Sequence, residues 1–183
     1  MQRLELSTQA DGVLESAAKA LLAGGVAIFP TDTVYGIGAL PQYSAALERI
    51  YKLKDRPLGM PLPLLISDIA QVRTISSFES ESLHLLAKAF WPGPLTLVLP
   101  DASKPSNSFL AQDGTIAVRS PDHAFIQSLC KLVGPIAATS ANLHGEPTPL
   151  QISGMPKAFE AVDLMIDGGE CSYGAASTIL DLS

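Results

Sequence analysis

Short apolar segments alternate with amphipathic segments along most of this chain, and this alternation restricts the folds that it can adopt. Continuous apolar strands between helices are typical of a sheet that helices cover. The predicted helices are residues 11–23, 44–52, 80–90 and 123–132. The predicted strands are residues 26–29, 62–66, 95–99, 115–118, 136–138, 164–166 and 177–180. The sequence therefore predicts an α/β fold. Because 183 residues suffice for one core and not for two ordinary domains, residues 1–183 are expected to form a single domain.

The composition excludes several classes of protein. Apolar residues make up 47% of the chain and charged residues 16%, which excludes a disordered protein. The net charge of −6 disfavours a nucleic-acid-binding surface over the whole chain, because phosphate binding requires a basic face. No apolar run has membrane-spanning length and the N-terminus has no signal core, so a cytoplasmic protein without membrane contact is expected. Cys130 and Cys171 have no metal-binding spacing and are expected to stay reduced.

Polar side chains follow three of the predicted strands directly. They lie in segments 30–33 (PTDT), 119–120 (RS) and 139–142 (TSAN). In open α/β sheets, ligands bind beyond the carboxyl ends of the strands. Each segment alone is equally typical of a turn or a helix cap. Together they predict one pocket that contains hydroxyls, an amide and a guanidinium.

Four basic residues, Arg49, Lys52, Lys54 and Arg56, lie within eight positions of this acidic chain. Cations at the end of a helix interact favourably with its dipole, so the cluster is consistent with a solvated helix end. It is also consistent with a polyphosphate site, because Arg and Lys both bind phosphate oxygens. The P-loop motif is absent, residues 36–41 do not match the dinucleotide-binding motif, and the HExxH and GxSxG motifs are absent.

Several short motifs, in a fixed order along nearly the whole chain, resemble the YrdC-like family. They are PTDTVYGIGA (30–39), KDRP (54–57), WPGPLT (91–96), VRSP (118–121), SAN (140–142) and ST (177–178). The resemblance implies a twisted open mixed sheet flanked by helices, with a central cavity. The best-known members are L-threonylcarbamoyladenylate synthases. These nucleotidyltransferases make threonylcarbamoyl-AMP and pyrophosphate from L-threonine, bicarbonate and ATP for the tRNA modification t6A at position 37.

The resemblance also implies roles for individual residues. Lys54 and Arg56 are expected to offset charge on the phosphates during catalysis. The residues expected around ATP are Lys54, Arg56, Thr115, Ser140, Asn142 and Thr148. The residues expected around L-threonine are Thr33, Arg119 and Ser177. Magnesium is expected to accompany ATP, with no tightly held cofactor and no protein metal site. The expected downstream partner is the tRNA threonylcarbamoyl transferase complex.

Two positions depart from the family pattern. Met60 replaces an Asn that many members carry beside the nucleotide, and Leu65 replaces a His that some longer members carry beside the amino acid. Because the sequence ends at Ser183, the short form without a second domain is expected. Two alternatives stay open: a YciO-like paralogue with another substrate, and a module that binds tRNA or double-stranded RNA without chemistry.

Overall fold

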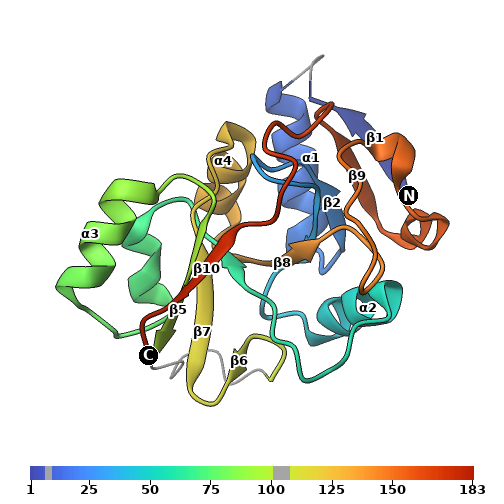
Figure 1. Cartoon of the computed structure of the whole chain (residues 1–183). Coiled ribbons are helices and arrows are strands. Elements are labelled where there is room, and N and C mark those ends of the chain that lie inside the picture. Colours follow the sequence, from blue (N-terminus) through green and yellow to red (C-terminus); the bar gives the residue numbers. More distant parts are fainter. Residues whose placement is uncertain (7–9, 101–107) are drawn as a thin grey trace.

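The computed structural model describes residues 1–6, 10–100 and 108–183 (Figure 1). The polar stretch 101–108, whose composition predicts a surface loop, lies outside the described residues apart from residue 108. The helices are α1 (Ala10–Leu22), α2 (Ser44–Lys54), α3 (Glu81–Phe90) and α4 (Ala124–Val133), with 3₁₀ turns at Ile69–Thr74, Ile152–Gly154 and Lys157–Ala161. The strands are β1 (Gln2–Glu5), β2 (Ala27–Phe29), β3 (Gly36–Ala39), β4 (Leu64–Leu65), β5 (Leu95–Pro100), β6 (Ala111–Gln112), β7 (Thr115–Arg119), β8 (Ile136–Ser140), β9 (Leu164–Asp167) and β10 (Thr178–Asp181).

The strands form one mixed sheet, in the order β1-β9-β2-β3-β8-β4-β7-β5-β10, with β6 paired to β7. Strand pairs β1–β9, β2–β9, β4–β7 and β5–β10 are parallel, and the remaining pairs in the described chain are antiparallel. The helices flank this sheet (Figure 1). The predicted α/β class and the twisted mixed sheet are therefore confirmed.

Capping side chains and prolines set the ends of the helices, as α3 shows. In α3, the Ser80 hydroxyl accepts a hydrogen bond from the Leu83 amide at 3.1 Å, which satisfies a free N–H of the first turn. The helix ends at Phe90, and Trp91 has extended backbone, because Pro92 disfavours helical backbone at the residue before it. Helices α1 and α4 pack on each other and on the sheet through one buried cluster, which includes Leu21 and Leu129. A second, larger cluster includes the buried face of α2.

Strand β3 lies in the middle of the sheet, between β2 and β8, and is absent from the prediction. Its sequence, GIGA, contains two glycines, which are unfavourable in a strand interior and hide the strand from pattern analysis. The structure gives the reason for them. A Cβ atom at Gly38 would lie 2.8 Å from the carbonyl oxygen of Ala137, and one at Gly36 would lie 2.9 Å from the Phe29 ring. The neighbouring elements therefore leave room only for glycine.

We expect Gly38→Ala to lower the free energy of unfolding by about 1–3 kcal/mol, because the added methyl must displace backbone in the centre of the sheet. Urea denaturation of both proteins measures the difference. Gly59→Ala is the matched control, since nothing lies within 4 Å of a Cβ atom at Gly59. Equal stability of the two variants would show that the sheet at β3 accommodates a side chain.

Candidate functional site

A cavity of about 310 Å³ opens over one face of the central sheet. Its floor includes alternate residues of four strands, namely Leu65, Val98, Ala117 and Ala138. Their strand neighbours, Leu64, Leu97, Val118 and Ala137, point into the larger core cluster. The period of two along a strand thus supplies a packed core on one face and a cavity floor on the other.

Five of the residues predicted from the sequence line this cavity, and they come from distant parts of the chain. Thr33 follows β2, Arg56 follows α2, Arg119 ends β7, Ser140 ends β8 and Ser177 precedes β10. The predicted convergence of the three polar segments is therefore confirmed. The polar segments alone predict a pocket beyond the strand ends, and the family resemblance implies a central cavity. The floor of the cavity lies across the face of the sheet.

The other four predicted residues do not line the cavity. Lys54 and Asn142 lie directly behind its wall, and their contacts are described below. Thr115 begins β7, at the opposite end of the strand from Arg119. Thr148 lies in the segment between β8 and the 3₁₀ turn Ile152–Gly154.

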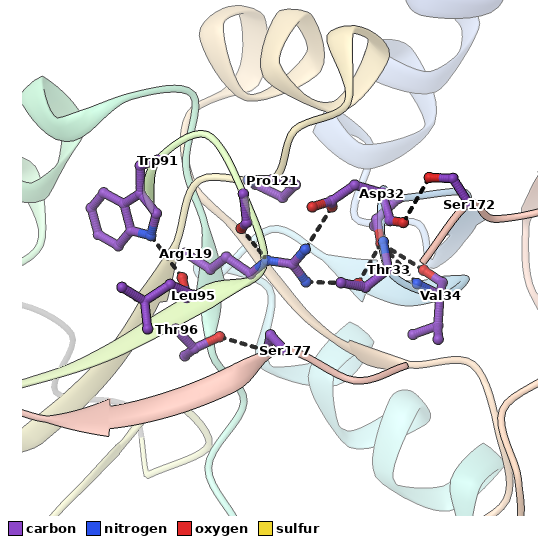
Figure 2. A network of polar contacts seen from close by, with 12 residues as sticks. Asp32, Thr33, Val34, Trp91, Leu95, Thr96, Arg119, Pro121, Ser172 and Ser177 are labelled. Carbon is purple, nitrogen blue, oxygen red and sulfur yellow. Dashed lines mark hydrogen bonds and ion pairs between the residues drawn. The ribbon is translucent and has the colours of Figure 1, made fainter. Parts of the chain in front are cut away.

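Arg119 donates three hydrogen bonds at the cavity, and Figure 2 shows its guanidinium between Asp32 and Thr33. Its Nη2 donates to Asp32 Oδ1 at 2.6 Å, its Nη1 to Thr33 Oγ1 at 2.8 Å, and its Nε to the Gly93 carbonyl at 3.0 Å. Arg119 is 6% exposed and Asp32 is 5% exposed, so this is a buried ion pair. Burial lowers the pKa of Arg119, and the Asp32 carboxylate opposes that shift. Among the described residues three of its five N–H groups have partners, and two stay available to a ligand.

The turn after β2 holds Thr33 in place for this contact. The Thr31 hydroxyl accepts hydrogen bonds from the amides of Thr33 and Val34 and donates one to the Val34 carbonyl at 2.7 Å. It also lies 3.0 Å from the Thr33 hydroxyl. Thr31 and Asp32 belong to the PTDT segment, and the family resemblance implies no individual role for either. A threonine two positions before Thr33, just after a predicted strand, is the sequence signal for such a turn.

A second polar contact closes the other side of the cavity. The hydroxyls of Thr96 and Ser177 lie 2.8 Å apart and join β5 to the segment that precedes β10 (Figure 2). Thr96 is 3% exposed and lines the cavity. Thr96 is the last residue of the WPGPLT motif, for which the family resemblance implies no individual role. A single threonine in a predicted strand carries no signal of its own.

Lys54 organises the wall of the cavity from behind. Its ammonium donates to the carbonyls of Ser140 and Asn142 at 2.5 and 2.6 Å and to Asn142 Oδ1 at 3.1 Å. The Ser140 hydroxyl donates to the same Asn142 Oδ1. Asp55 has left-handed backbone (φ 52°), which ends α2 between Lys54 and Arg56. Lys54 is thereby buried against the end of β8, while Arg56 lines the cavity.

Burial, and secondarily the positive charge of Arg56, lowers the pKa of Lys54 to about 8. The unfolded chain therefore holds this proton more tightly than the folded protein does. Between pH 8 and the ordinary lysine pKa, the free energy of unfolding must rise with pH. We expect wild type to gain about 2 kcal/mol relative to Lys54→Met between pH 7.5 and pH 10, measured by urea denaturation. A difference that stays constant or moves in the opposite direction would contradict the lowered pKa.

The described parts of the chain contain no group of three or more His, Cys, Asp or Glu side chains that could hold a metal ion. Among the described helices, none combines the length and the apolar character needed to cross a bilayer.

The fold and the cavity define a class of α/β proteins, and comparison with known proteins identifies it. The family model Sua5/YciO/YrdC, described as "Telomere recombination", matches residues 19–183. The chain belongs to this family. It is 40% identical over 181 residues to the threonylcarbamoyl-AMP synthase of Bacillus subtilis (strain 168), which covers 96% of this chain and 51% of the relative. The chain spans about half the length of the curated relatives from Bacillus subtilis and Pyrococcus abyssi that it matches.

Two solved structures share the fold at high similarity. The crystal structure of Pyrococcus abyssi Sua5 complexed with L-threonine is 35% identical and superimposes with a TM-score of 0.88, covering 99% of this chain and 54% of that chain. The crystal structure of Escherichia coli YciO is 26% identical and has a TM-score of 0.84, covering all of this chain and 89% of that chain.

Proposed function

We propose that this chain is an L-threonylcarbamoyladenylate synthase, which makes threonylcarbamoyl-AMP and pyrophosphate from L-threonine, bicarbonate and ATP. The observation that carries this proposal is the convergence of Arg56, Arg119, Ser140, Thr33 and Ser177 on one cavity. Two cations and several hydroxyls in one cavity suit a small zwitterion beside a polyphosphate. The names of the relatives and the threonine complex of the Pyrococcus abyssi protein support the same reaction. Residues 1–183 are proposed to carry this site as one unit.

The amino acid is proposed to bind at the end of the cavity that contains Arg119. Both Nη atoms of this guanidinium retain an N–H group without a partner among the described residues, and a carboxylate is a favourable acceptor for such groups. Thr33 lies beside Arg119 and is proposed to orient the substrate amine. Ser177 is proposed to contact the substrate hydroxyl.

The nucleotide is proposed to bind at the end that contains Arg56 and Ser140. Arg56 donates only to carbonyls of Met60 and Pro61 and, at 3.5 Å, to the Thr139 hydroxyl, so its charge has no acidic partner within the described chain. It is therefore available to offset phosphate charge. Lys54 and Asn142 are proposed to position Ser140 rather than to cover the phosphates.

The cavity is at the small end of ligand pockets, so part of ATP is expected to extend beyond it. Thr115 and Thr148 lie outside its lining and are proposed to meet only that outer part. Magnesium is proposed to enter with ATP, bound through phosphate oxygens and water.

The proposed reaction has two steps. The threonine amine attacks the bicarbonate carbon and an N–C bond forms. The C–OH bond of bicarbonate then breaks, and the hydroxyl leaves as water with a proton from the nitrogen, which gives a carbamate. A carbamate oxygen then attacks the α-phosphorus of ATP in line, and the bond between that phosphorus and the pyrophosphate oxygen breaks. The residues of this chain contribute by positioning both reactants and by neutralising charge. The product is an activated carbamate, for which a tRNA threonylcarbamoyl transferase complex is the proposed recipient.

One assay tests this proposal. The purified protein is incubated with ATP, magnesium, bicarbonate and L-threonine, and both pyrophosphate and the adenylate are measured, the latter by mass. Equal amounts of both products, with formation dependent on all three reactants, are expected. Pyrophosphate release that does not require L-threonine, or the absence of the adenylate, would overturn the proposal.

A YciO-like activity on another substrate is the second candidate, and two observations favour it. This chain matches 89% of the YciO chain but 54% of the Pyrococcus abyssi Sua5 chain, and Leu65 adds no polar atom beside Arg119. Adenylate formation with a different amine or amino acid, and none with L-threonine, would establish this candidate in the same assay.

A further inference from the structure

A second cavity, of about 530 Å³, is lined by residues of α3, α4 and the 3₁₀ turn Ile69–Thr74. Among the described residues, its lining shares none with the central cavity. Ser120 lines the second cavity and the preceding residue, Arg119, lines the central one, so the two cavities lie on either side of the chain at the end of β7. The proposed synthase reaction uses no residue of the second cavity.

Helices α3 and α4 supply polar side chains to this cavity at helical spacing. His84 and Lys88 are four residues apart on α3, and Gln127 and Lys131 are four residues apart on α4. Residues at this spacing lie on the same face of a helix. Each helix therefore presents one lysine of its last turn to the same cavity.

The charged side chains of the lining are balanced in favour of an anion. None of the salt bridges in the described chain involves either lysine of the lining. His84 is paired with Glu79 at 2.7 Å. The carboxylate of Asp68 also lines the cavity, but its two oxygens already accept hydrogen bonds from the Ser67 hydroxyl and the Ala70 amide. An anionic group in this cavity would therefore meet two cations without an acidic partner.

An indole and a proline ring form the apolar part of the wall. They belong to Trp91 and Pro92, which directly follow α3. The indole N–H of Trp91 donates to the Leu95 carbonyl at 2.7 Å, which fixes the ring and satisfies its polar atom. Figure 2 shows this ring on the side of Arg119 that is away from Asp32. A fixed aromatic ring is a favourable surface for stacking of a nucleobase.

We propose that the second cavity binds a nucleoside monophosphate, with the base against Trp91 and the phosphate between Lys88 and Lys131. A phosphate monoester carries up to two negative charges at pH 7, and lysine binds phosphate oxygens as a compact point charge. A volume of about 530 Å³ is within the range of small-molecule sites. This site is additional to the central cavity, and the inference does not depend on the proposed function.

The chain contains one tryptophan, Trp91, so tryptophan fluorescence reports on this cavity directly. The full chain is titrated with AMP, with excitation at a wavelength that adenine does not absorb. Adenosine and inorganic phosphate are then measured by competition with AMP. AMP is expected to change the fluorescence saturably and to bind at least about tenfold more tightly than either fragment, because only AMP makes both contacts. The absence of a saturable change, or a fragment that binds as tightly as AMP, would overturn the proposal.

The double variant Lys88→Met/Lys131→Met removes both charges and retains most of the apolar part of each side chain. It is expected to raise the Kd for AMP at least about tenfold. Lys19→Met is the matched control, because Lys19 is also an exposed lysine in the last turn of a helix and lines neither cavity. It is expected to leave the Kd unchanged. An equal Kd in wild type and in the double variant would overturn the proposal.

The variant Arg56→Ala distinguishes the two cavities, because Arg56 lines only the central one. It is expected to leave the AMP-dependent fluorescence change at its wild-type Kd. A Kd that rises in Arg56→Ala and not in the double lysine variant would place AMP in the central cavity and overturn the second site. Adenylate formation is measured in a separate assay, so failure of this site and failure of the proposed function are distinguishable.

Discussion

Arg119→Ala is expected to lower the free energy of unfolding by about 3–5 kcal/mol and to remove L-threonine-dependent turnover. The stability effect follows from Asp32, whose carboxylate would stay buried without its cationic partner. Asp32 Oδ2 already has no hydrogen-bond partner among the described residues, so the loss of Arg119 leaves the charge uncompensated. Urea denaturation measures this effect directly.

The double variant Asp32→Asn/Arg119→Ala separates the ion pair from other losses. It is expected to be more stable than Arg119→Ala alone, because no buried charge is left. Arg119→Lys retains the charge and lacks the planar fork, so it tests carboxylate binding in a protein that folds. It is expected to raise the KM for L-threonine far more than the KM for ATP. An equal effect on both KM values would move Arg119 away from the amino acid.

Arg56→Ala is expected to lower kcat/KM for ATP by about 10- to 100-fold and to leave the fold intact. A hydrogen bond to a charged group contributes about 1.5–3 kcal/mol, which corresponds to this loss. Arg56 is only partly buried and bonds mainly to two carbonyls of the following loop, so its removal leaves no buried charge without a partner. Steady-state pyrophosphate release and thermal denaturation measure the two parts of this prediction.

Arg49→Ala is the matched control for Arg56→Ala. Arg49 lies on α2, at the other end of the basic cluster from Arg56, and pairs with Asp163 at 2.9 Å and with the Ala161 carbonyl. It does not line the cavity. The ATP requirement is expected to stay at the wild-type value. Unchanged pyrophosphate release in Arg56→Ala would refute the phosphate role of Arg56.

The pattern of the sequence was sufficient for most of the secondary structure and for the class of fold. Helix α3 is an example. Its N-cap at Ser80 and its end before Pro92 depend on residues within or next to the helix, so the local sequence is enough to predict them. Strand β3 is absent from the prediction because its glycines are required by close contacts with the neighbouring strands. A local sequence pattern does not contain those contacts. The same limit applies to Lys54, because its hydrogen bonds to carbonyls 86 and 88 positions away cannot be read from its place in a basic cluster.

The sequence by itself indicated which polar residues meet, because Thr33 lies in the turn after β2 and Arg119 and Ser140 end their strands. The reason that they meet is tertiary, since β4 is parallel to β7 and antiparallel to β8, and the carboxyl ends of β7 and β8 therefore lie at opposite edges of the sheet, joined by the cavity across its face. Only the tertiary structure decided what each of them faces. The register of β4 and β5 against β7 places Leu65 and Thr96 beside Arg119, and burial pairs Arg119 with Asp32. Register and burial depend on contacts between residues far apart in the chain, and no local pattern of amino acids records those contacts.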